Sequence, residues 1–246
     1  MSDPDWTVLV PIEVLEGETI PESVVDVLTT LPVVVLGYHV LPEQTPPGQA
    51  RLQFETQAQT KLDELAAAFR ETGGPVETRL VFTHDEEQTL DRVADETGCD
   101  AILVPNPAPE VERLLVPLSG EVNGSRIAEF VAALIGDRDI AVTLLHVADD
   151  EAETSAGRSI LSDAAAHLRD SGVPDAAITS EVTVSQAPIR TIATAAVDHH
   201  AVVMGESEPS LRSFLFGDTS EQVAAQSVGP VVVVRRERDG DGSGET

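Results

Sequence analysis

An internal duplication constrains the fold of this chain more than any other feature. Val-Leu-Val-Pro-Ile at 8–12 returns as Leu-Leu-Val-Pro-Leu at 114–118, and Asp-Ala-Ile-Leu-Val-Pro at 100–105 returns as His-Ala-Val-Val-Met-Gly at 200–205. Two further matches fall between these in the same order, at a separation of about 100 residues. Self-similarity at a fixed spacing indicates tandem copies of one structural unit.

Both halves alternate short apolar runs with longer amphipathic segments, which is typical of βα units in an α/β protein with a parallel sheet. Expected strands in the first half lie near 7–12, 33–40, 77–82 and 101–104, with helices near 20–30, 50–72 and 86–98. Expected strands in the second half lie near 113–118, 140–147, 178–184, 201–205 and 231–235, with helices near 123–136, 153–171, 187–198 and 219–227.

The two halves are unequal in length. After Val104 the chain passes through Pro-Asn-Pro-Ala-Pro-Glu directly into the second copy, so the first copy lacks the last loop, helix and strand of the second. We therefore predict a truncated domain over 1–106, a complete domain over 112–236 and a disordered acidic tail over 237–246. The truncated domain would expose a sheet edge beside its fourth strand, and an exposed edge must be covered.

The charge of the chain excludes several classes of function. There are 43 acidic and 15 basic residues, for a formal net charge of −28, and Lys61 is the only lysine. Self-repulsion of this size is screened within roughly 3 Å at 1 M salt, so we predict a halophilic, cytoplasmic protein. Nucleic-acid binding needs clustered Lys and Arg and is not expected. No apolar run approaches the ~20 residues of a membrane span, so no direct membrane contact is expected either.

The second half resembles the universal stress protein family. The resemblance rests on Val-Val-Met-Gly at 202–205, Phe-Gly-Asp-Thr-Ser-Glu-Gln-Val at 216–223 and Gly-Pro-Val-Val-Val-Val at 229–234. It extends more weakly into the first half. The resemblance implies an adenine nucleotide alpha hydrolase-like fold, with an open parallel sheet of order 3-2-1-4-5 in the second domain and four strands in the first. Tandem two-domain members are common in that family.

Nucleotide-binding members of this family carry G-x2-G-x9-G-[ST] after the fourth strand, where glycines let backbone amides approach phosphate. Here Gly205 and Gly217 are kept, but Glu208 and Asp218 replace the second Gly and the Ser/Thr, and Ser119 replaces the usual sugar-binding acid. The candidate degenerate nucleotide site comprises Ser119, Val147, Met204, Gly205, Gly217, Asp218, Thr219 and Ser220.

The charge of the 205–220 loop opposes phosphate binding. Glu206, Glu208 and Asp218 face the single Arg212, and Asp218 with Glu221 three residues later forms a capping pattern that satisfies a helix N-terminus internally. We therefore favour a structural loop and expect no cofactor. The alternative is that ATP or AMP binds here, helped by a cation or by high salt.

Other candidate groups carry weaker signals. Cys99 precedes an apolar strand, so we expect it to be buried and inert. His39 and His146 occupy equivalent strand ends and are expected to pack structurally. His199 and His200 could hold a metal only with a third ligand, which the spacing does not supply, so no metal site is predicted.

These observations favour a non-catalytic universal stress-like protein that acts through association or a weakly bound small ligand, in a stress response implied by the resemblance. One alternative is an adenine-nucleotide-binding regulatory switch that uses the 205–220 loop. A second is a soluble partner of a membrane transporter, because similar tandem domains are attached to transporters. The last strand, at 230–235, is expected to be an exposed edge that pairs between the two domains of a pseudo-dimer or across a homodimer.

Overall fold

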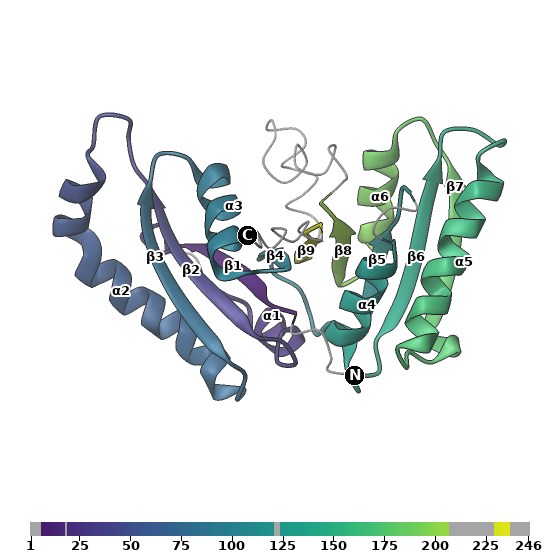
Figure 1. Ribbon diagram of the computed structural model, residues 1–246, viewed down its shortest axis with the longest axis horizontal. Helices are drawn as coiled ribbons and strands as arrows, with labels where there is room; N and C mark the ends of the chain where they lie inside the picture. Colours follow the sequence, from purple (N-terminus) through teal and green to yellow (C-terminus); the bar gives the residue numbers. More distant parts are fainter. Residues whose placement is uncertain (1–5, 18, 121–123, 207–228, 237–246) are drawn as a thin grey trace, which may run out of the picture.

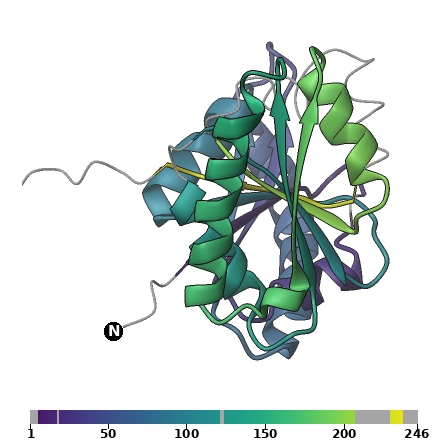
Figure 2. The ribbon, with the colours of Figure 1, turned by 90° about the vertical axis from the view of Figure 1, so that its right-hand side faces the viewer.

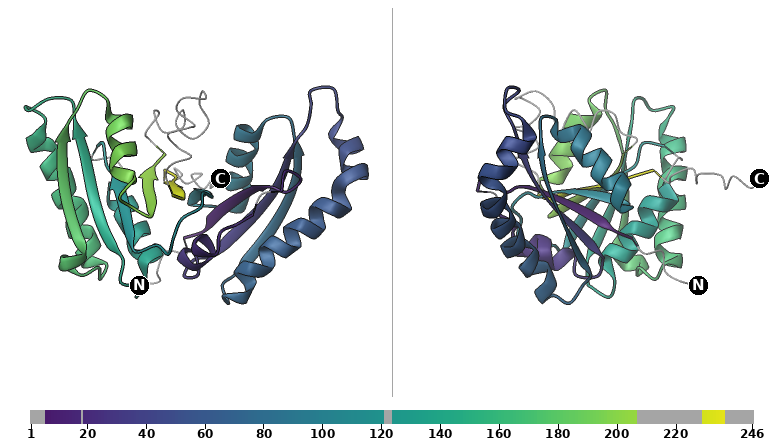
Figure 3. Two further views of the ribbon diagram at one scale, coloured as in Figure 1. Left: turned by 180° about the vertical axis from the view of Figure 1, so that it is seen from behind. Right: turned by 60° about the vertical axis from the view of Figure 1, so that its left-hand side comes forward.

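The computed structural model describes residues 6–17, 19–120, 124–206 and 229–236. Within these ranges nine strands form a single sheet, in the order β3-β2-β1-β4-β9-β8-β5-β6-β7. Figure 1 shows the two halves of the chain splayed on either side of β9, with helices covering both faces of each half. Figure 3 shows α2 lying along the outer side of the first half.

The first half follows the predicted βα alternation. Its elements are β1 (Val8–Glu13), α1 (Glu22–Val27), β2 (Val33–Val40), α2 (Pro47–Glu71), β3 (Val76–Thr83), α3 (Glu86–Thr97) and β4 (Ala101–Val104). Capping chemistry sets the bounds of α3, because the Asp85 carboxylate accepts a hydrogen bond from the Gln88 N–H at 2.9 Å and Gly98 ends the helix at a φ of 72°.

The second half repeats the same order of elements. They are β5 (Arg113–Pro117), α4 (Gly124–Ile135), β6 (Ala141–Ala148), α5 (Thr154–Asp170), the 3₁₀ turn η1 (Asp175–Ala177), β7 (Ile178–Val184), α6 (Pro188–Ala196), β8 (Ala201–Gly205) and β9 (Val231–Val234). Figure 2 shows α5 and α6 on opposite faces of this half. The predicted elements are confirmed to within three residues, except for the helix predicted at 219–227, which lies outside the described residues.

The strand β9 joins the two halves into one sheet. It pairs in parallel with β8, with Gly205 opposite Val234, and antiparallel with β4, with Val104 opposite Val231. The expectation of two separate sheets is therefore wrong. Of the two kinds of pairing expected for the edge at 230–235, the structure has the one between the two halves of the chain. The edge of β4 that the missing fifth strand would cover pairs with β9 instead, and this pairing also covers the second edge of β9.

Contacts beyond the sheet also connect the halves. Trp6 packs edge-on against Phe130 of α4, with ring centroids 5.4 Å apart. The guanidinium of Arg138 donates hydrogen bonds to the carbonyls of Asp26 and Val27 at the end of α1, both at 2.9 Å. Burial lowers the pKa of Arg138, and the nearby Asp26 opposes this shift. A cation at these carbonyls satisfies the C-terminal end of α1 from across the interface.

The helices are built to cover a sheet. In α2, the longest described helix, Ala58, Leu62, Leu65 and Phe69 are buried at helical spacing, whereas Leu52 is 91% exposed. Among the described residues, no helix combines the length and the apolar character that crossing a membrane requires.

Candidate functional site

The described part of the candidate nucleotide site lies at the carboxyl ends of three adjacent parallel strands. Ser119 follows β5, Val147 lies near the end of β6, and Met204 and Gly205 end β8. Ser119 is exposed, Val147 is half-buried, and Met204 and Gly205 are buried. Ligands of open α/β sheets bind at such an edge. The remaining candidates, at 217–220, lie outside the described residues.

A buried histidine fixes the chain beside Ser119. The Nδ1 atom of His146 donates a hydrogen bond to the Leu118 carbonyl oxygen at 2.7 Å, because a carbonyl can only accept. Its imidazole ring lies against Gly157 of α5, where an added Cβ would come 2.9 Å from the ring Cγ. His146 thus has the packed structural role predicted for it, and it requires a glycine beneath its ring.

An acidic side chain stands directly after Gly205. The Glu206 N–H donates to the Val234 carbonyl at 2.8 Å, which extends the pairing of β8 with β9 by one residue. The Glu206 carboxylate accepts a hydrogen bond from the Arg236 N–H at 3.0 Å. A carboxylate therefore lies directly after the end of β8, and its negative charge opposes a phosphate at this position.

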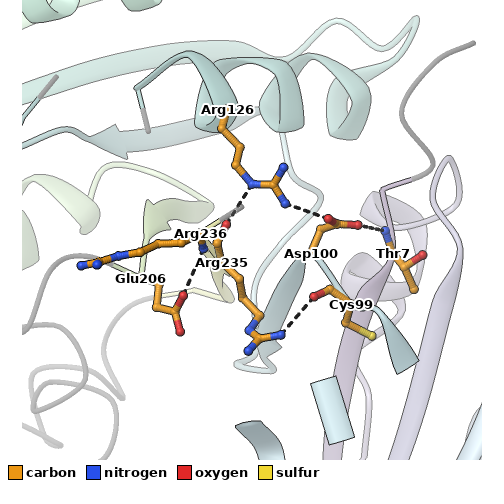
Figure 4. Close-up of polar contacts among 7 residues, drawn as sticks. All are labelled: Thr7, Cys99, Asp100, Arg126, Glu206, Arg235 and Arg236. Atoms are coloured by element: carbon orange, nitrogen blue, oxygen red, sulfur yellow. Dashed lines mark hydrogen bonds and ion pairs between the residues drawn. The ribbon is translucent and has the colours of Figure 1, made fainter. Parts of the chain in front are cut away.

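Next to this edge lies a polar cluster that no sequence pattern predicted, shown in Figure 4. We call it the Asp100 cluster; it comprises Thr7, Asp100, Arg126 and Arg235. Arg126 forms an ion pair with Asp100 at 2.7 Å and donates to the Arg235 carbonyl at 2.9 Å. The other Asp100 carboxylate oxygen accepts from the Thr7 N–H at 3.1 Å. The cluster joins β1, β4, α4 and the end of β9 at one point.

The side chains of the two arginines in this cluster are already engaged. Arg235 pairs with Asp95 at 2.7 Å and donates to the Cys99 carbonyl at 3.3 Å. The Arg126 guanidinium lies 4.7 Å from the centre of the Trp6 ring, a cation–π contact. These two cations lie close to the candidate site, but they serve the interface between the halves.

The counterpart edge in the first half is arranged differently. Glu13, which ends β1, accepts a hydrogen bond from the Val40 N–H at 3.3 Å. Val40 ends β2 and holds the place that Val147 holds near the end of β6. The carboxylate of Glu13 therefore occupies a backbone donor at this edge.

The remaining candidate groups are held by structural contacts. His199 Nδ1 contacts the Ala195 carbonyl at 2.7 Å, and His200 Nδ1 accepts from the Glu112 N–H at 3.0 Å. Neither histidine belongs to a group of three metal-ligating side chains among the described residues. Cys99 is buried, and burial raises the pKa of its thiol although a hydrogen bond with Thr97 opposes this.

A groove of about 640 Å³ lies between α6 and the strands β6 and β7. It is lined mainly by polar side chains, including Glu181, Arg190, Thr191, Thr194 and Asp198. None of the candidate nucleotide-site residues lines it, so the groove on this sheet face is separate from the edge at β5, β6 and β8.

Comparisons with known proteins bear on both halves. The sequence model of the Universal stress protein family matches residues 110–235. No curated protein matches the sequence. A solved universal stress protein from Archaeoglobus fulgidus is 15% identical, with a TM-score of 0.62 over 94% of this chain and 98% of its own. The cytoplasmic domain of a prokaryotic cation chloride cotransporter is 11% identical, with a TM-score of 0.53 over 95% of this chain and 96% of its own.

One further structure concerns a single half of the chain. The universal stress protein from Archaeoglobus fulgidus in complex with dAMP is 18% identical, with a TM-score of 0.40, and covers 50% of this chain and 96% of its own. At such identities a structural similarity concerns the fold alone, and the first two structures show that it extends through both halves.

Proposed function

Because the chain belongs to the universal stress protein family, we propose that it is a non-catalytic member that acts through association or a weakly held small ligand. The observation that carries the proposal is the Glu206 carboxylate directly after the end of β8, which accepts a hydrogen bond from the Arg236 N–H at 3.0 Å. A phosphate at this edge would be repelled by this negative charge. A role in a stress response is part of this proposal, and membership of the family supports it.

We also infer that residues 1–106 and 112–236 are tandem family domains that form a pseudo-dimer within one chain. The arrangement of β3-β2-β1-β4 on one side of β9 and β8-β5-β6-β7 on the other supports this inference. With both edges of β9 paired, association with another protein must use a different surface. A stress-response partner would then bind the helical faces or the outer strands β3 and β7.

Isothermal titration calorimetry with ATP, ADP and AMP at molar KCl tests the proposal. We expect no heat of binding at millimolar ligand, which corresponds to a binding free energy weaker than about 4 kcal/mol. A matched gain-of-function variant is Ser119→Asp, which restores the acidic residue that the family resemblance places against the sugar. Tight nucleotide binding by the unaltered chain would overturn the proposal.

A second candidate is an adenine-nucleotide switch, and one observation favours it. Ser119, Val147 and Gly205 do gather at a single sheet edge, where ligands of such folds bind. On this hypothesis Gly217→Asp abolishes binding. Gly48→Asp is the matched control, because an added Cβ at Gly48 meets nothing within 4 Å and the variant adds the same charge in the other half.

A further inference from the structure

Three side chains that can bind a metal ion lie together at the carboxyl ends of β1 and β2. Glu13, Glu16 and His39 each offer one ligand atom, and these atoms all lie within 4.8 Å of one another. The Nδ1 atom of His39 lies 3.3 Å from the Oε1 atom of Glu13. The cluster belongs to the first half and is separate from the candidate nucleotide site.

The turn after β1 brings the two carboxylates together. The Glu16 N–H donates to the Glu13 carbonyl at 3.3 Å, and Gly17 continues the turn with a φ of 80°, a conformation that favours glycine. Val14 packs onto β2 where Gly37 has no side chain, since a Cβ there would lie 2.9 Å from Val14 Cγ1. The turn is therefore held against the strand that carries His39.

The environment of His39 points its Nδ1 atom toward these carboxylates. Its ring lies edge-on to Phe54 and Phe82, with both centroid distances 6.3 Å, and its side chain is 18% exposed. Nδ1 is buried and lacks a hydrogen bond among the described residues, because its contact with Glu13 does not have hydrogen-bond geometry. A buried polar atom without such a partner needs an explanation.

The second copy of the repeat provides an internal comparison. His146 occupies the equivalent strand end, and its Nδ1 is satisfied by the Leu118 carbonyl at 2.7 Å. No acidic cluster of this kind surrounds it in the described residues. The same position in the fold thus serves packing in one copy, whereas in the other it presents a ring nitrogen to two carboxylates.

The donor set and its spacing fit a transition-metal ion. Ligand atoms at about 2.0–2.1 Å from Zn²⁺ in tetrahedral geometry lie about 3.4 Å apart, close to the 3.3 Å between His39 Nδ1 and Glu13 Oε1. Imidazole suits Zn²⁺, whereas Mg²⁺ and Ca²⁺ prefer oxygen ligands alone. Glu16 is exposed and can move to close the remaining distance.

We propose that Glu13, Glu16 and His39 form a Zn²⁺ site in the first half of the chain. The Val40 N–H, which donates to the Glu13 carboxylate at 3.3 Å, orients that ligand. Two carboxylates and a neutral imidazole carry a charge of −2, which a divalent cation neutralises. The three protein ligands leave one tetrahedral position for water, and the ion holds the turn after β1 to the end of β2.

Calorimetric titration of the full chain with Zn²⁺, after treatment with EDTA and at high KCl to screen diffuse binding, tests the site. We expect one Zn²⁺ per chain, with Mg²⁺ failing to compete. Removing even an outer-shell partner of a metal costs about 10–100-fold in affinity, so losing a ligand in Glu16→Gln or His39→Gln should cost about 100-fold or more.

Matched controls separate this site from adventitious binding. His167→Gln removes an exposed histidine from α5, and Glu151→Gln removes an exposed carboxylate, so both should bind Zn²⁺ as the unaltered chain does. Should His39→Gln fail to fold, Glu16→Gln still decides the matter, because Glu16 is exposed and circular dichroism verifies its fold. Unchanged affinity in Glu16→Gln, or loss of binding in a His199→Gln, His200→Gln variant instead, would overturn the proposal.

Discussion

The two halves of the molecule end their fourth strands differently. In the second half β9 comes 26 positions after the end of β8, whereas in the first half β4 is followed by the proline-rich connector and β5. Both fourth strands nevertheless pair with the same strand, β8 in parallel and β4 antiparallel. One copy of a duplicated unit can therefore lack its own last strand when the last strand of the other copy pairs along both of its edges.

The all-valine sequence of β9 follows from this shared position. Val231, Val232 and Val234 are buried, and the strand has neighbours on both edges. A strand in the middle of a covered sheet has no solvent-facing side, so it lacks polar alternation. Without β4, one edge of this all-valine strand would be unpaired and prone to aggregation.

Proline substitutions in β9 should give the largest effect and can separate its two edges. The Arg235 N–H donates to the Asp100 carbonyl at 2.7 Å, so by strand alternation the Val233 N–H also faces β4, whereas the Val232 N–H faces β8. Val233→Pro should disrupt the pairing of β9 with β4, which we call the seam between the halves. Val232→Pro should disrupt the pairing of β9 with β8 within the second half. Each should lower the free energy of unfolding by about 3 kcal/mol or more, measured by urea denaturation.

Val184→Pro is the control for these variants, because Val184 lies on the edge strand β7. The Ser185 N–H donates to the Ala148 carbonyl at 2.9 Å, so the Val184 N–H points away from β6, toward the edge where the described sheet ends. Proline is tolerated at such positions. Equal destabilisation by Val184→Pro and Val233→Pro would contradict the assignment of β9 as the strand that connects the halves.

The dependence of the melting temperature on KCl tests whether repulsion between acidic side chains destabilises the joined halves. With a net charge of −28, repulsion should be largest in the compact state, so the melting temperature should rise steeply from low salt to molar KCl. Sucrose at equal osmolality is the control, since it favours burial without screening charge. A melting temperature that does not change with KCl would refute the halophilic interpretation.

The next prediction concerns the histidine that differs between the copies. Ala58 takes the place of Gly157 when Phe69 is aligned with Leu168, and the His39 ring lies edge-on to Phe54 and Phe82 rather than over a glycine. Gly157→Ala should force the His146 ring aside and cost about 2 kcal/mol in thermal or chemical unfolding. In a double-mutant cycle with His146→Ala, this cost should shrink.

Gly48→Ala is the matched glycine control. Gly48 also lies in a helix, α2, but an added Cβ there meets nothing within 4 Å. Alanine should therefore stabilise this position by about 0.5–1 kcal/mol. If Gly157→Ala were equally stabilising, the packing of His146 on α5 would not be the reason that position 157 requires glycine.

A smaller effect is expected from the Asp100 cluster. Arg126 and Asp100 are 21% and 26% exposed, and Arg126→Gln removes their charge-assisted contact, which should cost about 1–2 kcal/mol in urea denaturation. Arg92→Gln is the control, because its ion pair with Glu96 lies on one helix with both side chains about half exposed. That change should stay within about 0.5 kcal/mol. Equal effects would mean that the cluster does not hold the halves together.

The sequence predicted local structure well because its signals are local. Apolar periodicity and the Gly and Pro stops defined the elements within each half, and the repeat verified one half against the other. The partner of β9 was not decided, since the valines at 231–234 are equally suited to pairing within the chain and between chains. The choice depends on how the connector after Val104 places β4, and no local pattern encodes that.

The candidate site was predictable in position but not in chemistry. Strand ends in a parallel sheet meet at one edge, so Ser119, Val147 and Gly205 could be placed together from the strand order alone. Arg126 and Asp100 could not, because they come from different halves and meet only at the seam. His39 and His146 occupy equivalent strand ends in the repeat, and they differ in the partner of Nδ1, which side-chain packing determines.

Cys99 provides the smallest and most local test of the seam. It precedes β4, its carbonyl accepts from Arg235, and burial raises the pKa of its thiol. Because the folded-state pKa is raised, the native protein keeps the neutral thiol, and its contribution to stability is lost as the pH rises through the folded-state pKa. A thiol-specific disulfide reagent at about pH 8 should therefore react slowly with the native chain and rapidly with the urea-unfolded chain.

Val233→Pro should speed the reaction of Cys99 in the native chain, because separation of β9 from β4 exposes this end of β4. Val184→Pro should leave that rate unchanged. Equal rates in both variants would show that Cys99 becomes accessible by a route other than the seam.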